Sequence, residues 1–419
     1  MIQEFFEKAH VQRRLQCGPL ATVFGIYVDH LKVRGYGRTT IQHYVQAVEH
    51  FGAWLARRGH SIADVDLALV GEFLGRHLAR CRCRRQRSRT MPTMRAALRQ
   101  LLAVFPSVGA ERPVAAPATT SVDSVIAAFD HHLVQTCGLA AATRHSYRRE
   151  VRALLVARFG AGAVDLAALG PTEVQSFVTA RAQHLCPASA NSVSNAVRAL
   201  VRFLALQGIR TAGAPSAVPR AAVWRLSHVP RVLSDTELAA FLAAFDRTTA
   251  LGRRDYAIAV CLVTLGMRAG EVAAIKLDDI DWRAATLAIP ADKSRRGTRM
   301  PLPAQVATAL AEYLRRGRPV TAERAVFVHH RAPRGTRGDA SLIRIAVRRA
   351  YARAGLDPRL TGTHVLRHTA ATRLLRAGAS MKEIADVLRH RSLDTSAIYT
   401  KVDRTALHGV ALPWPEVQP

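Results

Sequence analysis

Acidic residues are scarce in this sequence. Asp and Glu total 31 against 60 Lys and Arg, which gives the 419-residue chain a formal net charge of +29. A charge of this size repels itself until a polyanion neutralises it, and nucleic-acid phosphates are the usual neutraliser. The charge balance therefore favours a nucleic-acid partner, with a membrane surface as the competing polyanion.

Long apolar runs and a secretion signal are also missing. The longest apolar run, about Tyr256 to Met267, is too short to span a bilayer and suits a buried helix. The first ten residues mix Glu4, Glu7 and Lys8 with two phenylalanines and lack the pattern of a signal peptide. We therefore expect no membrane partner and a cytoplasmic, nucleoid-associated protein.

Cysteines are few and scattered. The only close pair, Cys81 and Cys83, has one residue between its members, which matches no common zinc or redox spacing. The spacing predicts reduced thiols, with no metal site and no cofactor. The six cysteines are Cys17, Cys81, Cys83, Cys137, Cys186 and Cys261.

The composition is that of a folded chain, with 49% apolar and 22% charged residues. The length suggests roughly three domains of about 150 residues each, and proline-containing stretches mark the boundaries. We predict an N-terminal helical domain at 1–112, a second helical domain at 118–210, a linker at 211–231, a third domain at 232–403 and a tail at 404–419.

Two segments of the chain resemble each other at an offset of about 100 residues. Val65-Asp66-Leu67-Ala68 pairs with Val164-Asp165-Leu166-Ala167, and Phe73 pairs with Phe177. Apolar residues in both segments recur every three or four positions, which is typical of amphipathic helices. The pattern favours a duplicated helical domain over chance similarity between helices rich in alanine, arginine and leucine.

An arginine run marks the first copy. In a chain this basic, such a run is either a solvated loop or a loop that contacts phosphates. We place Arg198 and Arg202 of the second copy in the same DNA-binding class. The arginines of the run are Arg80, Arg82, Arg84, Arg85, Arg87 and Arg89.

The third domain begins with Ser234-Asp235-Thr236-Glu237, the pattern of a capping box at a helix start. After the buried helix, two extended runs at Thr286–Ile289 and Thr298–Leu302 flank a polar turn, which predicts a hairpin. Helical periodicity returns from Leu342 onward. The domain is expected to be mostly helical with a small antiparallel sheet.

Basic residues of this domain stand in unusual contexts. Arg268 follows the apolar run directly, so it is either a salt-bridge partner of Glu271 or a guanidinium that Glu271 holds toward an anion. His364 and Arg367, three residues apart, share one helical face. Two further candidates are Lys293 at the predicted hairpin tip and the pair His390 and Tyr399.

Together and in this order, these residues resemble the tyrosine recombinase (phage integrase) family over about residues 232–403. Arg389 departs from the glycine usual before the histidine of the third motif, and Asp292 departs from the glycine usual before the hairpin lysine. An additional helical copy at the N-terminus is also unusual, and is either an arm-site DNA binder or a longer clamp. The matching motifs are Thr264-Leu265-Gly266-Met267-Arg268-Ala269-Gly270-Glu271, Lys293, His364-Val365-Leu366-Arg367-His368, Leu388-Arg389-His390 and Ala397-Ile398-Tyr399-Thr400.

The resemblance implies a mainly α multidomain fold and a catalytic set of Arg268, Lys293, His364, Arg367, His390 and Tyr399, with Glu271 in support. It implies that Tyr399 forms a 3′-phosphotyrosine at specific sites in double-stranded DNA. Four protomers on two sites would exchange strands through a Holliday junction, for integration or excision of a mobile element and with sister recombinases or accessory proteins as possible partners. The tail would dock on a neighbour or pack on its own domain.

The chemistry suits these residue types. Guanidinium groups stay charged and donate paired hydrogen bonds to phosphate, which fits Arg268 and Arg367. Tyrosine, with a reference pKa of about 10, must lose its proton as it attacks, and His364 is the natural acceptor or orienter. Lys293 would protonate the leaving 5′ oxygen. The competing hypotheses are a topoisomerase-like relaxase and a DNA-binding accessory protein with an inactive site.

Overall fold

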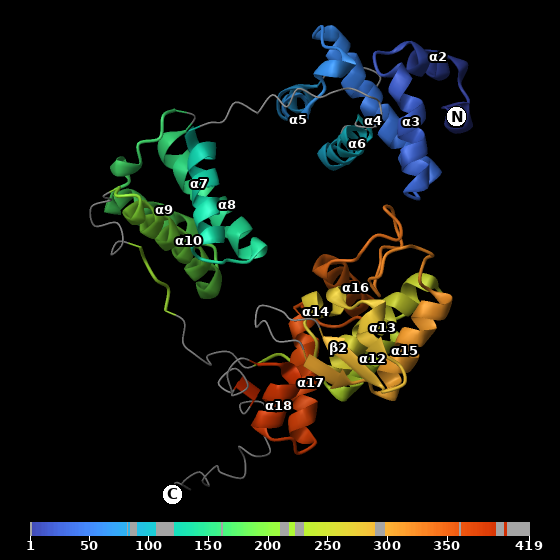
Figure 1. The fold of residues 1–419 in the computed structure, drawn as a ribbon, viewed down its shortest axis with the longest axis vertical. Helices are drawn as coiled ribbons and strands as arrows, with labels where there is room; N and C mark the ends of the chain where they lie inside the picture. Colours follow the sequence, from blue (N-terminus) through green and yellow to red (C-terminus); the bar gives the residue numbers. More distant parts are fainter. Residues whose placement is uncertain are drawn as a thin grey trace, which may run out of the picture. The chain divides into compact units, whose positions relative to one another are not determined.

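The computed structural model describes residues 2–81, 83, 90–105, 121–160, 162–209, 218–222, 230–289, 298–359, 362–390 and 398–399. The chain divides into two units, one of Val114–Ser227 and one of Met1–Pro113 with His228–Pro419. Helices dominate both (Figure 1). No helix among the described residues is both long enough and apolar enough to cross a membrane.

The N-terminal domain packs its helices around one apolar core. Phe51 and Phe73 are fully buried there, and the buried Tyr27 hydroxyl donates a hydrogen bond to the carbonyl oxygen of Ala97 at 2.9 Å. The elements are α1 (Ile2–Phe5), α2 (Ala9–Cys17), α3 (Ala21–Val33), α4 (Arg38–Arg57), η1 (Ile62–Asp64), α5 (Leu67–Glu72), η2 (Phe73–His77), η3 (Leu78–Arg80) and α6 (Met91–Val104).

The central domain is a smaller helical unit with its own core, built around Phe129, Leu155 and Leu204. Prolines at the first positions of α9 and α10 begin these helices, because a first-turn residue needs no intrahelical N–H bond. The elements are α7 (Ser121–Gln135), α8 (Ala141–Phe159), η5 (Leu166–Ala168), α9 (Pro171–Ala182) and α10 (Pro187–Leu206).

The two helical domains share an order of elements. In each, two long helices are followed by shorter helical elements that include a 3₁₀ turn, and then by a long last helix. The aligned aspartates also play similar parts, because Asp66 caps α5 through the Leu69 amide at 2.7 Å and Asp165 caps η5 through the Ala167 amide at 3.0 Å. The shared order supports the predicted duplication.

The C-terminal domain is mostly helical, as predicted. The capping box at Ser234 is confirmed, with the Glu237 amide donating to Ser234 Oγ and the Ser234 amide donating to the Glu237 carboxylate. Its elements are α12 (Asp235–Ala243), α13 (Ala250–Thr264), α14 (Ala269–Ala274), η6 (Leu277–Asp279), β1 (Ile280–Asp281), β2 (Thr286–Ile289), β3 (Thr298–Pro301), α15 (Ala304–Arg316), α16 (Ala340–Arg353), α17 (Thr363–Arg376) and α18 (Met381–Leu388).

The sheet is antiparallel and runs in the order β1-β2-β3. The predicted hairpin is confirmed, because β2 pairs with β3 in a register that sets Leu287 opposite Met300. The sequence missed β1, which has only two residues and shows no alternation. The hairpin turn, which includes Lys293, lies outside the described residues.

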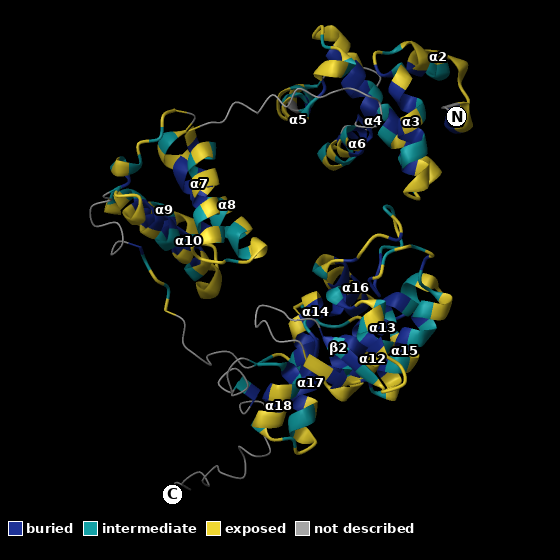
Figure 2. Ribbon diagram, in the orientation of Figure 1, coloured by how far each residue is buried: buried dark blue, intermediate teal, exposed yellow. Residues whose placement is uncertain are grey.

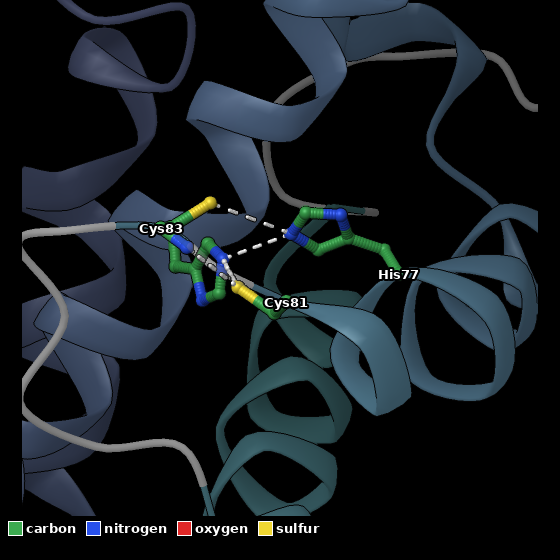
Figure 3. Close-up of side chains that lie close together, drawn as sticks. His77, Cys81 and Cys83 are labelled. Carbon is green, nitrogen blue, oxygen red and sulfur yellow. Dashed lines mark hydrogen bonds between the residues drawn. The ribbon is translucent and has the colours of Figure 1, made fainter.

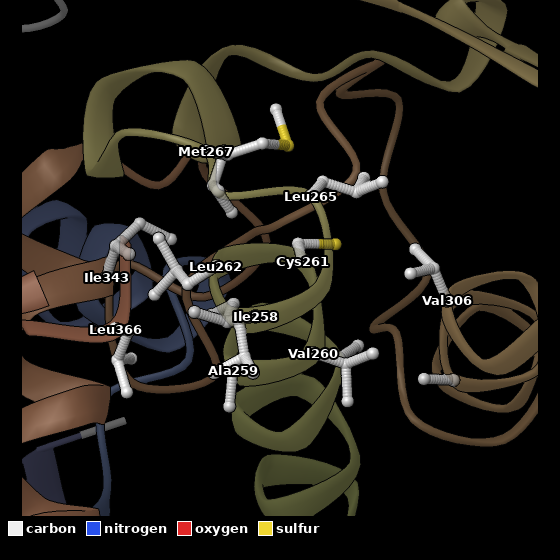
Figure 4. Packing of buried hydrophobic residues seen from close by; sticks show 14 of the residues in the cluster. Ile258, Ala259, Val260, Cys261, Leu262, Leu265, Met267, Val306, Ile343 and Leu366 are labelled. Carbon is white, nitrogen blue, oxygen red and sulfur yellow. The ribbon is translucent and has the colours of Figure 1, made fainter. Parts of the chain in front are cut away.

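Helix α13 forms the centre of this domain. Its second half is buried (Figure 2), and every residue from Ala257 to Val263 is at most 5% exposed. Its side chains pack against α15, α16 and α17 through Val306, Ile343 and Leu366 (Figure 4). Neighbours on several sides explain why the sequence of α13 is apolar all round instead of along one stripe.

Two of the scattered cysteines are not isolated. Cys81 and Cys83 follow η3, and their side chains lie beside the ring of His77 (Figure 3). The buried His50 of α4 completes a group whose potential ligand atoms all lie within 4.8 Å of one another. The cysteine spacing gave no hint of this group, because its other two members are histidines, of which His77 lies four positions before Cys81 and His50 is brought in by the fold.

Candidate active site

The end of α13 delivers Arg268 to the site. Gly266 turns the chain with a φ of +57°, and a Cβ there would lie 2.4 Å from Leu388 Cδ2, so the turn requires glycine. Arg268 then caps α14, donating its backbone N–H to Glu271 Oε2 and its guanidinium to Glu271 Oε1, both at 2.7 Å. The predicted Arg268–Glu271 pair therefore forms, with the arginine side chain still 37% exposed.

The buried Glu271 carboxylate holds a second arginine. Arg389 donates to Glu271 Oε2 at 2.7 Å from the end of α18. Burial alone would raise the pKa of Glu271, but the hydrogen bonds from Arg389 and Arg268 outweigh it and lower the pKa below the usual range. Glu271 thus stays ionised and fixes two guanidinium groups.

The backbone of Arg389 keeps the turn for which glycine is usual at this position. Its backbone is left-handed, with φ 55° and ψ 49°, the conformation that favours the glycine usual at this position. The turn geometry is therefore kept, and the side chain uses it to reach Glu271. Left-handed backbone costs a non-glycine residue about 1 to 2 kcal/mol, which the ion pair offsets.

Arg367 lies deep in α17, only 4% exposed. Its guanidinium donates to the carbonyl oxygens of Gly266 and Leu388, so it joins the ends of α13 and α18. Burial, followed by the charge of Arg268, lowers the pKa of Arg367 to about 10, which leaves it charged at neutral pH. A guanidinium has five N–H donors, so two carbonyl bonds leave capacity for an anion.

Tyr399 is 1% exposed and lies among histidines. Its hydroxyl oxygen lies 3.1 Å from Nδ1 of His368, and its ring stacks with the ring of His390 at a centroid distance of 6.3 Å. The sequence hypothesis named His364 as the proton acceptor, whereas the hydrogen-bond partner here is His368, one helical turn further along α17. His368 carried a signal in its i+4 spacing from His364.

The pKa values of these groups favour uncharged forms. Burial, then the charge of Arg367 among other groups, lowers the pKa of His368 and of His390 to about 4. Partial desolvation, then Arg367 and Arg268, lowers the pKa of the exposed His364. Burial raises the pKa of Tyr399 although Arg367 and Arg268 act against it. At neutral pH, the phenol and the two buried imidazoles are therefore neutral.

Comparison with known proteins identifies relatives of this chain. The phage integrase family matches residues 231–405, and the N-terminal SAM-like domain of phage integrases matches twice, at residues 26–105 and 126–208. A Sinorhizobium fredii protein named "Putative integrase/recombinase y4rA" is 38% identical over 95% of both chains. Tyrosine recombinase XerD of Mycobacterium tuberculosis is 33% identical over 67% of this chain and 93% of its own.

The chain belongs to the phage integrase family of tyrosine recombinases. It is an enzyme of a family that cleaves and rejoins DNA. The predicted fold class is confirmed, including the small antiparallel sheet. The double match to the SAM-like domain also supports duplication over chance similarity.

Solved recombinases share the fold. XerH bound to a palindromic difH substrate superposes with a TM-score of 0.52 at 20% identity, over 68% of this chain and 85% of that one. A lambda integrase dimer bound to a COC′ core site gives a TM-score of 0.52 at 18% identity, over 70% of this chain and 99% of that one. Their resemblance extends the family assignment to the level of architecture.

The remaining predictions concern the DNA-binding arginines, Lys293 and the tail of this recombinase. Arg198 donates to the carbonyl oxygens of Val218 at 2.9 Å and Pro219 at 3.3 Å and so ties them to α10. Arg202 and Arg80 are exposed on α10 and at the end of η3. Residues outside the described ranges are Lys293, Arg82, Arg84, Arg85, Arg87, Arg89 and the tail 404–419.

Proposed function

We propose that this recombinase cuts specific sites in double-stranded DNA by attack of the Tyr399 hydroxyl on a backbone phosphate. The observation that carries the proposal is the hydrogen bond between that hydroxyl and His368 Nδ1, in a site where Arg367 and Arg268 exert their charges on the phenol. A neutral imidazole can take the phenolic proton as the new bond forms. This arrangement is what a tyrosine nucleophile requires.

The proposed reaction exchanges one phosphodiester for another. The Tyr399 oxygen forms a bond to phosphorus, the bond from phosphorus to the 5′ oxygen breaks, and the phenolic proton passes to His368. The leaving 5′ oxygen takes a proton from the Lys293 ammonium. The products are a 3′-phosphotyrosine and a 5′ hydroxyl, and attack by a 5′ hydroxyl of a partner strand reverses the steps and rejoins DNA.

Arg268 and Arg367 are assigned to the non-bridging phosphate oxygens, which gain negative charge in the transition state. The Glu271 carboxylate accepts a hydrogen bond from Arg268, and a backbone carbonyl oxygen accepts one from Arg367. Both guanidinium groups are therefore held in place before DNA binds. His364 and His390 add neutral N–H donors at the same phosphate. The reaction balances without a nucleotide, a metal or another cofactor.

The proposed role in the cell is based on family membership and on the net charge of the chain. We propose that four protomers act on two sites through a Holliday junction. The two SAM-like copies bind the DNA through their arginines. The predicted domain boundaries and the linker separate these two copies from the catalytic domain. Relatives named integrase/recombinase and the net charge of +29 support action on the nucleoid DNA of the cytoplasm. Integration or excision of a mobile element, with sister recombinases as partners, is the proposed outcome.

Trapping in cells tests this function without knowledge of the site. The wild type and the Tyr399→Phe variant are expressed, the cells are lysed in detergent, and DNA that remains bound to protein is sequenced at its ends. We expect discrete paired positions a few base pairs apart in the wild type and none in the variant. Scattered positions favour a relaxase, and tight DNA binding without trapping favours an accessory protein.

A further inference from the structure

Four side chains of the N-terminal domain meet at one point away from the active site. His50 comes from the last turns of α4, His77 from the end of η2, and Cys81 and Cys83 follow η3. The segment η2 is a single π-helical turn between α5 and a 3₁₀ turn, an irregularity that occurs often at functional sites. It sets His77 beside the two thiols (Figure 3).

The distances match a tetrahedral metal site. With Zn–N of about 2.0 to 2.1 Å and Zn–S of about 2.3 Å, tetrahedral angles place two nitrogens about 3.3 Å apart, and nitrogen and sulfur about 3.6 Å apart. Here His50 Nε2 and His77 Nε2 are 3.1 Å apart, His50 Nε2 and Cys81 Sγ 3.4 Å, and His77 Nε2 and Cys83 Sγ 3.8 Å. The remaining pairs of ligand atoms lie within 4.8 Å of one another, which leaves one ion at the centre within reach of all four after small side-chain movements.

The surroundings hold the ligands in place. His50 is fully buried, and its ring meets the edge of Phe73 at a centroid distance of 5.1 Å, while His77 stacks on the same ring at 5.2 Å. Arg57 donates to Cys83 Sγ at 3.4 Å, which favours the thiolate, the form of cysteine that binds metals. Ligands fixed by packing lose little freedom on binding an ion.

We propose that His50, His77, Cys81 and Cys83 bind one zinc ion. Two thiols release their protons to solvent, so that two thiolates and two neutral imidazoles surround the ion and balance its charge. Four protein ligands leave no open position, which is typical of a structural site. The ion would tie the start of the arginine run to α4, beside a hollow bordered by Arg57, Arg58, Arg76 and Arg80.

Metal content of the full-length chain is the first test. We expect one zinc per chain after purification, and a thiolate charge-transfer absorption when cobalt replaces the zinc. The double variant Cys81→Ser with Cys83→Ser should lose both signals, whereas the control Cys137→Ser with Cys186→Ser removes two exposed thiols and should keep them. Absence of zinc in the wild type after growth in zinc, with no cobalt absorption, overturns the proposal.

A second measurement needs no variant and so does not depend on the folding of one. Thiols of the native wild type are counted with a soluble disulfide reagent before and after addition of a zinc chelator. We expect two further thiols to react after chelation and a lower melting temperature. If the reactive thiols are the same with and without chelator, the four side chains form only a hydrogen-bonded cluster, and the zinc site is refuted. Neither measurement depends on recombination.

Discussion

Nδ1 of His368 lies 3.1 Å from the hydroxyl oxygen of Tyr399, and the two residues are 31 positions apart in the chain. The pKa of His368 is lowered to about 4, mainly by burial, so its ring is neutral at pH 7 and can accept the phenolic proton. We therefore expect His368→Ala to slow cleavage about 10² to 10⁴-fold, the usual range for loss of a general base. Single-turnover cleavage of a nicked substrate measures the rate.

The control for this change is His10→Ala, which removes an exposed histidine outside both matches to the SAM-like domain. It should cleave at the wild-type rate, and His368→Ala should still bind the substrate with normal affinity. A His368→Ala enzyme that cleaves at the wild-type rate would show that the hydrogen bond only positions the tyrosine ring in the free protein.

Substitution of Arg389 isolates its backbone strain. Arg389→Ala loses the bond to Glu271 and keeps the left-handed backbone, whereas Arg389→Gly loses the same bond and removes a strain of about 1 to 2 kcal/mol. We therefore expect the glycine variant to melt above the alanine variant. Thermal unfolding by circular dichroism checks the order, and equal melting temperatures, or a more stable alanine variant, would contradict the strain assigned to this position.

Local signals in the sequence predicted a large part of the fold. The capping box at Ser234, the all-round apolar helix α13 and the hairpin of β2 and β3 each depend on residues close in the chain. The contacts that the sequence did not predict join distant positions. Examples are Arg389 with Glu271 and His368 with Tyr399, where tertiary packing alone decides which partner is reached.

The same reason explains two further contacts that the sequence did not predict. Arg198 was predicted to contact DNA, and the fold also brings the segment at Val218 to its guanidinium. The cluster of Cys81 and Cys83 with His50 was not predicted, because this histidine lies 31 positions before Cys81 and joins the cluster only after α4 has packed against η2. Motif spacing detects ligands on one short segment and misses those that a fold assembles.

We assign to Lys293 the donation of a proton to the leaving 5′ oxygen. Replacement of that bridging oxygen by sulfur in the DNA tests this step separately. A 5′ thiolate is a far better leaving group than an alkoxide, since thiols have a pKa of about 8.5. Lys293→Ala should therefore cleave a normal strand about 10² to 10⁴-fold more slowly and a strand with a bridging 5′ sulfur nearly as fast as the wild type does. Arg268→Ala should cleave both strands slowly. If the bridging sulfur restores cleavage equally in both variants, Lys293 is not the proton donor.

Stability of the catalytic domain should depend on pH through His330. Burial, then the charges of Arg254 and Arg334, lowers the pKa of His330 to about 4, whereas the unfolded chain keeps about 6.5. Between these values the unfolded state binds more protons, so stability falls as pH drops from 6.5 towards 4 and is constant above 6.5. Because His330 is half-buried, we expect a loss of only about 1 kcal/mol from this group.

Melting temperatures of the wild type and His330→Gln at pH 7.5 and 5 check this effect. Glutamine takes up no proton, so the variant should lose less stability than the wild type on acidification. Equal losses would place the pH dependence elsewhere, for example at the other depressed histidines, His368 and His390.

The most direct test of the account is chemical identification of the covalent bond. A nicked DNA duplex from a mapped site is incubated with the full-length recombinase, the adduct is digested with protease and nuclease, and the modified peptide is sequenced by mass spectrometry. The account predicts a nucleotide joined through its 3′ phosphate to Tyr399, with a free 5′ hydroxyl on the released strand. A bond to another residue, or a link through a 5′ phosphate, would contradict it.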